Sequence, residues 1–179
     1  MRPRSFVPLL ALLALAGGVA HAALDETGQS TVSFAATGTM GMRIVGTTHE
    51  LDVADDGSTL RITVPLAHLA TGIDLRDEHM RDHLDVAHHP SAVLTVSRSS
   101  LVVPTSSETS GDASGTMEIH GRTHAVTFHY RAEPRDGTIR VTASTRIDLG
   151  HYGIEVPSYM GIEVDRRVAV NASFRVHDR

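Results

Sequence analysis

The feature that most constrains the fold is an alternation of apolar and polar residues with a period of two, repeated over most of the chain. A β-strand places successive side chains on opposite faces, so this period indicates strands with one buried and one exposed face. Segments at 42–53 and 117–120 extend the pattern, and the whole predicts about eight strands. The clearest alternating runs lie at 32–36, 60–66, 92–96, 126–130, 139–147 and 168–176.

Strands with one apolar face must close into a barrel or stack on another sheet to bury it. Turn sequences such as Asp55-Asp56-Gly57 and Asp136-Gly137 separate the predicted strands, and 105–114 is interpreted as a polar hairpin loop. We therefore predict an all-β fold, a single and mostly antiparallel β-barrel of about eight strands.

The segment from Thr71 to Pro90 departs from the alternation. Leu75, Met80 and Leu84 recur at helical spacing and predict one short amphipathic helix. Asp74 or Asp77 is expected to cap its first turn.

The N-terminus has the layout of a secretory signal. Arg2 and Arg4 precede an apolar run at 6–16, and Val19-Ala20-His21-Ala22 provides a small-x-small cleavage site. The run is shorter than the roughly 20 residues of a membrane-spanning helix, so the chain is not expected to span a membrane. We predict a signal peptide at 1–22 and one mature domain at 23–179, exported to the periplasm, with secretion also possible.

Charge and cysteine content narrow the partners. The full chain carries a formal net charge of −5. Removal of Arg2 and Arg4 leaves 14 basic against 21 acidic residues, or about −7. This balance argues against nucleic acid or an anionic membrane surface as a partner. With no cysteine there is no lipoprotein anchor and no disulfide, and a homodimer remains compatible with the sequence.

Histidines concentrate in and after the predicted helix, and they suggest an alternative function. His79 and His83 stand four residues apart, which places them on one helix face like a two-histidine metal site. His88, His124 or Asp82 is a candidate third ligand, and a cluster of His79, His83, His88 and His89 would make a metal-binding envelope protein. The HExxH motif is absent, however, and a solvated, charged helix explains the same residues.

Catalysis has little support in the sequence. No Gly-x-Ser-x-Gly motif and no cysteine nucleophile are present. The adjacent Asp55 and Asp56 lie in a glycine-containing turn, where aspartate is expected for backbone reasons. A hydrolase would need a histidine hydrogen-bonded to both a hydroxyl and a carboxylate in a cleft. We expect no enzyme activity, no cofactor and no catalytic residue.

The barrel interior is the remaining candidate site. A barrel of about eight strands either fills with its own side chains or holds one small apolar ligand, and the composition permits both. Tryptophan is absent and many inward positions carry valine or alanine, which leaves room. The residues expected to line the interior are Phe34, Ile62, Val64, Leu94, Phe128, Tyr130, Val141, Tyr152 and Phe174.

Three stretches together resemble the YceI family of bacterial lipocalin-like proteins. The first is TGIDLRDEHMR at 71–81, followed by Leu-Asp-Val at 84–86 and a proline at 90. The second is EIHGRTHAV at 118–126, and the third combines Tyr152-Gly153-Ile154 with 164–168. The resemblance spans essentially the whole chain after residue 22.

The resemblance implies a lipocalin-like antiparallel barrel with a helix beside it, enclosing an apolar channel. It also implies a lipid-like ligand, such as a polyisoprenoid, a prenylated quinone-like compound or a fatty amide, bound without a reaction. In this interpretation Arg76, Asp77 and His79 form a structural clasp and are not catalytic.

Overall fold

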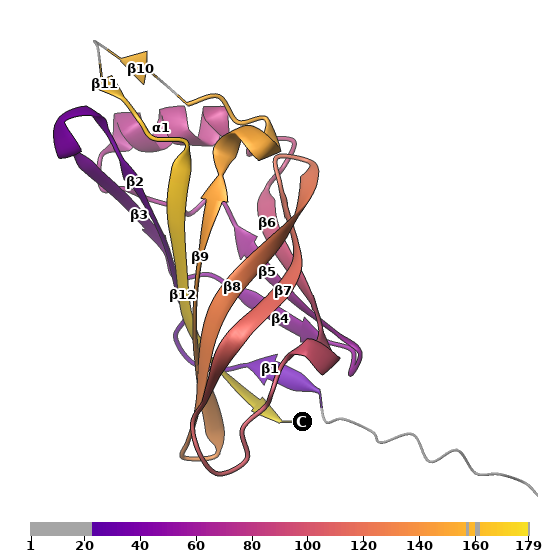
Figure 1. Ribbon diagram of the computed structural model, residues 1–179. Coiled ribbons are helices and arrows are strands. Elements are labelled where there is room, and N and C mark those ends of the chain that lie inside the picture. Colours follow the sequence, from indigo (N-terminus) through magenta and orange to yellow (C-terminus); the bar gives the residue numbers. More distant parts are fainter. Residues whose placement is uncertain (1–22, 157, 160–161, 179) are drawn as a thin grey trace, which may run out of the picture.

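A curled antiparallel sheet forms most of the protein in the computed structural model, which describes residues 23–156, 158–159 and 162–178 (Figure 1). Hydrogen-bonded neighbours follow the order β3-β2-β12-β9-β8-β7-β6-β5-β4, and β1 pairs with β12. The predicted all-β, antiparallel fold is confirmed, whereas the predicted signal peptide lies outside the described residues. The strands of this sheet are β1 (Leu24–Glu26), β2 (Thr31–Thr37), β3 (Arg43–Thr48), β4 (Asp52–Asp55), β5 (Thr59–Pro65), β6 (Ser91–Ser97), β7 (Thr109–Ile119), β8 (Arg122–Arg135), β9 (Thr138–Asp148) and β12 (Arg167–Asp178).

The two edge strands of the sheet, β3 and β4, do not pair with each other, and each is hydrogen-bonded to another segment. Thr47 of β3 exchanges two backbone hydrogen bonds with Ala70, at 2.8 and 3.0 Å, so the segment after β5 runs along this edge. At the other end of the curl, β1 pairs antiparallel with the last residues of β12, and its Leu24 amide donates to Asp55 Oδ2 of β4 at 3.2 Å. The sheet is therefore a partly open barrel.

Inward and outward side chains alternate as the sequence predicts. On β8, Phe128, Tyr130 and Ala132 are buried, whereas His129 and Arg131 between them are exposed. The tight turn at Asp136-Gly137 joins β8 to β9, with φ of 50° and 75°, the left-handed values that a two-residue hairpin turn requires.

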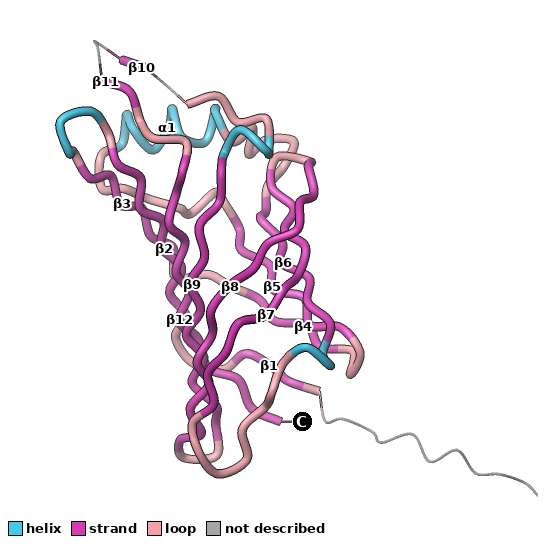
Figure 2. The backbone as a smooth tube through the Cα atoms, in the orientation of Figure 1, coloured by secondary structure: helices cyan, strands magenta, loops and turns pink. Residues whose placement is uncertain are grey.

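One α-helix, α1 (Asp74–His83), lies across the upper end of the curled sheet in Figure 1, within the segment predicted to be helical. The tube in Figure 2 also shows the short 3-10 helices η1 (Thr39–Gly41), η2 (Arg98–Ser100) and η3 (Leu149–Tyr152) at strand ends. A small hairpin of β10 (Ser158–Tyr159) and β11 (Ile162–Glu163) completes the described elements. Within the described ranges, no helix combines the length and the apolar character that crossing a membrane needs.

Two segments differ from the expected strands. The stretch at 42–53 forms two strands, β3 and β4, at opposite edges of the sheet. Where β3 ends, Thr48 is buried and its Oγ1 accepts from the Glu50 amide at 3.2 Å. The hairpin loop predicted at 105–114 is shorter than expected, because it ends at Glu108 and β7 begins at Thr109. The small polar residues at 109–114 belong to β7, and each of them pairs with a residue of β8.

The expected N-cap of the helix is also wrong. Ile73 occupies the cap position and no side chain caps the first turn. Asp77 is engaged elsewhere, because its Oδ1 accepts from the Thr71 amide at 2.7 Å.

Candidate ligand-binding cavity

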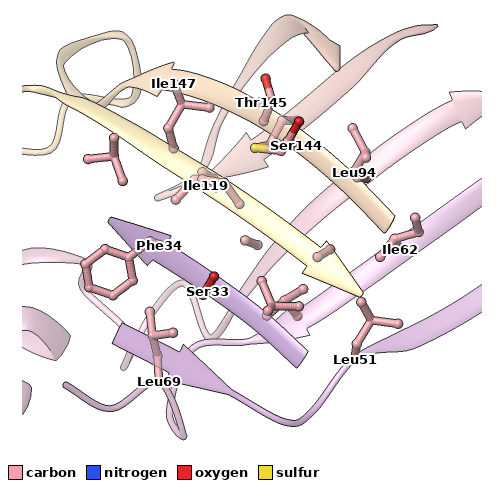
Figure 3. Close-up of a pocket in the computed structure, with 18 of the residues that line it drawn as sticks. Ser33, Phe34, Leu51, Ile62, Leu69, Leu94, Ile119, Ser144, Thr145 and Ile147 are labelled. Carbon is pink, nitrogen blue, oxygen red and sulfur yellow. The ribbon is translucent and has the colours of Figure 1, made fainter. Parts of the chain in front are cut away.

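The inner face of the sheet surrounds an apolar cavity of about 620 Å³. This volume falls within the ~300–1,000 Å³ of pockets that bind small molecules. The cavity extends from Leu24 and Val176, near β1, to Leu75 and His79 of α1, so it follows the long axis of the barrel. Figure 3 shows residues from several strands around it, among them Phe34, Ile62 and Leu94.

Small residues at paired positions create part of this space. Ala172 of β12 lies opposite Ala143 of β9, and Ala143 lies opposite Tyr130 of β8. Both alanines border the cavity and are only half-buried, although they point to the inside of the sheet. Protein interiors are normally close-packed, and the small side chains of these two alanines leave the space beside them in the cavity unfilled.

A glycine fixes the position of the largest side chain on β2. Phe34 pairs with Gly46 of β3, and a Cβ added at Gly46 would lie 2.1 Å from Phe34 Cε1. The ring therefore lies directly on the glycine backbone, against the wall. Any side chain at position 46 would push the ring away from this place.

Eight of the nine predicted lining residues border the cavity: Phe34, Ile62, Val64, Leu94, Phe128, Tyr130, Val141 and Phe174. Their binding of a ligand remains a prediction. The ninth, Tyr152, does not border it. It is 1% exposed and packs with Met117, Ile119 and Ile147, with its ring edge-on to His124 at 5.3 Å. The strand alternation ends with β9, and in η3 the Tyr152 ring packs against Met117, Ile119 and Ile147, which themselves border the cavity.

At the upper end, Thr71, Arg76 and Asp77 form a hydrogen-bonded clasp that anchors α1. Thr71 Oγ1 donates to Asp77 Oδ1 and accepts from Arg76 Nε at 2.7 Å, and Arg76 Nη2 donates to the Thr71 carbonyl at 3.0 Å. Burial is the largest influence on the Asp77 pKa and raises it. The Thr71 hydrogen bonds and the Arg76 and Arg81 charges together outweigh burial and leave the pKa below its ordinary value.

His79 is not part of this clasp, contrary to the expectation. Its side chain is exposed on α1 and borders the cavity together with His83. The Arg76 and Asp77 parts of the expected clasp are therefore present, and the third partner is Thr71.

The histidines of the metal-binding alternative do not form a metal site. In residues 23–156, 158–159 and 162–178, no group of three or more His, Cys, Asp and Glu side chains could hold a metal ion. His88 Nδ1 pairs with Asp85 Oδ1 at 2.7 Å, a hydrogen bond that raises the pKa of His88. His89 packs edge-on to His120 with ring centroids 5.4 Å apart.

The arrangement that a hydrolase needs is also absent from the part of the chain that the structure describes. His129 Nδ1 pairs with Asp112 Oδ1 at 2.9 Å on the outer face of the sheet, where both side chains are exposed. Ser144 lies opposite His129 in register, yet no described histidine is hydrogen-bonded to both a hydroxyl and a carboxylate.

Near the lower end of the cavity lies a buried ion pair that the sequence pattern does not reveal. Arg98 Nε donates to Asp55 Oδ2 at 2.9 Å, and the two side chains are 7% and 0% exposed. Arg98 also borders the cavity. Asp56 makes the turn contacts expected of the Asp-Asp-Gly sequence, because its Oδ1 accepts from the Ser58 and Thr59 amides. In the sequence, Arg98 stands in a serine-rich stretch that resembles an exposed loop.

Comparison with known proteins gives matches at the level of family and fold. No curated protein matches the chain. A polyisoprenoid binding domain from Saccharophagus degradans, implicated in plant cell wall breakdown, is 17% identical with a TM-score of 0.73, covering 89% of this chain and 100% of that one. Burkholderia cenocepacia BcnA is 15% identical, with a TM-score of 0.67 and coverage of 82% and 95%. A Campylobacter jejuni YCEI protein is 12% identical, with a TM-score of 0.54 and coverage of 100% and 99%.

These structural similarities, all at low identity, establish the shared fold. Residues 23–176 also match the YceI-like domain over nearly the whole described chain. The protein belongs to the YceI-like domain family.

Proposed function

We propose that the protein is a periplasmic carrier that sequesters a long apolar amphiphile in its cavity and catalyses no reaction. The candidate ligands are a polyisoprenoid, a prenylated quinone-like compound or a fatty amide. The observation that carries the proposal is the cavity of about 620 Å³, which is bordered mainly by aliphatic and aromatic side chains along the length of the barrel.

The physical chemistry of burial fits a long, flexible chain. Each methylene moved from water into an apolar site contributes about 0.8 kcal/mol, so ten methylenes contribute about 8 kcal/mol before the cost of association. Binding of this kind needs few polar contacts, and the cavity wall offers few.

Other observations support the remaining parts of the proposal. A solved structure that shares the fold of this chain is described as a polyisoprenoid binding domain. The signal-like sequence at 1–22 supports export. The absence of a histidine bonded to both a hydroxyl and a carboxylate in the described residues supports a role in binding over hydrolysis.

Native mass spectrometry of the protein purified from a cell envelope tests the binding. We expect an added mass from a co-purified apolar molecule, lost after extraction with organic solvent and regained with added polyprenol. A clean apo mass, with no uptake of added polyprenol, would contradict it.

Export needs its own test. When the full chain is expressed, cell fractionation should find the protein in the periplasm with Ala23 as its first residue. A chain expressed without residues 2–22 should stay in the cytoplasm. Recovery of the full-length chain from the cytoplasm would contradict the periplasmic role while leaving ligand binding intact.

A further inference from the structure

Arg98 places a cationic side chain against an otherwise apolar cavity. It lies in η2, directly after β6, where its own amide donates to the Ser58 carbonyl at 2.7 Å. Its side chain borders the cavity while remaining 7% exposed. Buried ion pairs contribute little net stability compared with apolar packing, so stability alone does not explain a cation at this place.

Part of the guanidinium is free to bind a ligand. Among the described residues, Nε is the only Arg98 side-chain nitrogen with a hydrogen-bond partner, and no fully buried side-chain nitrogen or oxygen lacks one. The two Nη nitrogens are thus accessible, and the space that Arg98 borders is the cavity. They offer hydrogen-bond donors to whatever occupies it.

A second donor comes from Tyr130. Its hydroxyl accepts from the Val102 amide at 2.9 Å, which leaves the phenolic proton available for donation. Tyr130 is 6% exposed and also borders the cavity. Val102 and Arg98 lie on the same connection between β6 and β7, so this connection contributes to both donor positions.

The charge balance at this place favours a neutral ligand group. Asp55 neutralises Arg98, and both carboxylate oxygens are occupied. Oδ2 accepts from Arg98 Nε and the Leu24 amide, and Oδ1 accepts from the Gly57 amide at 2.8 Å. An anionic head would add an uncompensated charge to a buried apolar site, which is costly. An uncharged carbonyl would accept hydrogen bonds without that cost.

We propose that the Arg98 guanidinium and the Tyr130 hydroxyl bind the head of the ligand, and that this head is an uncharged carbonyl such as an amide or a quinone. The apolar chain then runs from this end of the cavity toward α1. The inference rests on the proposed function and specifies the chemical class and the orientation of its ligand.

Three probes with the same chain length test this assignment: hexadecanamide, hexadecanoate and hexadecane. Each is used to displace a fluorescent naphthylamine from the mature protein. We expect the amide to bind about tenfold more tightly than hexadecane, the effect of about 1.4 kcal/mol of net hydrogen bonding. We expect hexadecanoate to bind more weakly than the amide.

Substitutions test whether Arg98 and Tyr130 cause the preference for the amide over hexadecane. Arg98→Lys keeps a charge opposite Asp55 but removes the guanidinium fork, so the preference for the amide should fall from about tenfold to about threefold while the affinity for hexadecane stays unchanged. Tyr130→Phe should lower the same preference in part. Arg140→Lys, at an exposed position of β9, is the matched control and should leave it intact.

The results that would overturn this inference differ from those that would overturn the proposed function. Equal binding of amide and hexadecane by the wild type, tighter binding of hexadecanoate than of the amide, or an unchanged preference in Arg98→Lys would overturn this inference and leave cavity binding standing. Failure of all three probes to bind would overturn the proposed function itself.

Discussion

At the scale of single residues, Gly46 keeps the cavity wide because it has no side chain beside Phe34. The Phe34 ring lies on Gly46 because the glycine has no Cβ, and a methyl group there would overlap the ring. The open space beside the ring is the cavity that it borders, so a displaced ring is expected to enter it.

Gly46→Ala should therefore narrow the cavity and strain the wall. We expect a loss of about 1–3 kcal/mol in the free energy of unfolding, typical of overpacking, with weaker uptake of long-chain ligands. Urea unfolding and ligand titration measure the two effects. Gly111→Ala is the control, since its added Cβ would lie 3.8 Å from Tyr130, an ordinary contact. Unchanged stability and binding in Gly46→Ala would show that Phe34 has room elsewhere.

Asp77 gives the clasp a pH dependence. Its pKa in the folded protein lies below the ordinary value, so its contribution to stability is fully present above that value, about 3.9, and is lost as the pH falls through the lowered pKa. Asp77→Asn should destabilise the protein by about 1–2 kcal/mol at neutral pH, and the difference from wild type should shrink below about pH 4.

Urea unfolding of both proteins between neutral pH and about pH 3 measures this difference. Asp74→Asn is the control, because Asp74 is exposed on the same helix and does not cap it. A difference between Asp77→Asn and wild type that stays constant down to the acid limit would contradict the role assigned to Asp77.

At the scale of elements, the period of two predicts where strands lie but not how they are joined. The runs that form β5, β6, β8, β9 and β12 alternate clearly, because one face of each meets the interior. The periodicity of 42–53 does not reveal that this stretch divides into β3, which pairs with β2, and β4, which pairs with β5. The first half of β7 is small and polar, and its pairing with β8 makes it a strand.

The candidate site is predictable to a similar extent. Alternation finds eight of the lining residues because they lie on regular strands. It fails for Tyr152, which follows the end of β9 in η3. It also fails for Asp55 and Arg98, which are 43 residues apart and meet only through tertiary folding.

The position of Tyr152 leads to a prediction for η3. Tyr152→Ala should cost about 3–5 kcal/mol of unfolding free energy, as for other large buried aromatics, because it empties a packed cluster. Ligand affinity per folded molecule should remain that of the wild type, since the ring does not border the cavity. Tyr152→Phe, which keeps the ring, serves as the milder variant. A stable Tyr152→Ala with reduced ligand affinity would place the residue in the binding site after all.

At the scale of the whole molecule, the barrel holds its shape by different means at its two ends. The clasp of Thr71, Arg76 and Asp77 anchors α1 across the upper end, and the Asp55–Arg98 pair joins β4 to η2 near the lower end. Between them the wall is apolar and contains the paired alanines at 143 and 172. Packing fixes the wall, and the missing side-chain volume leaves the space for a ligand.

Filling that space at Ala143 tests most directly whether the cavity is the binding site. Titration with a long-chain amphiphile should show that wild type binds about one equivalent and that Ala143→Phe binds at least about tenfold more weakly, a difference of about 1.4 kcal/mol. Ala125→Phe adds the same side chain at an exposed position of β8 and should bind like wild type. Wild-type affinity in Ala143→Phe, or an equal loss in both variants, would contradict binding in the barrel interior.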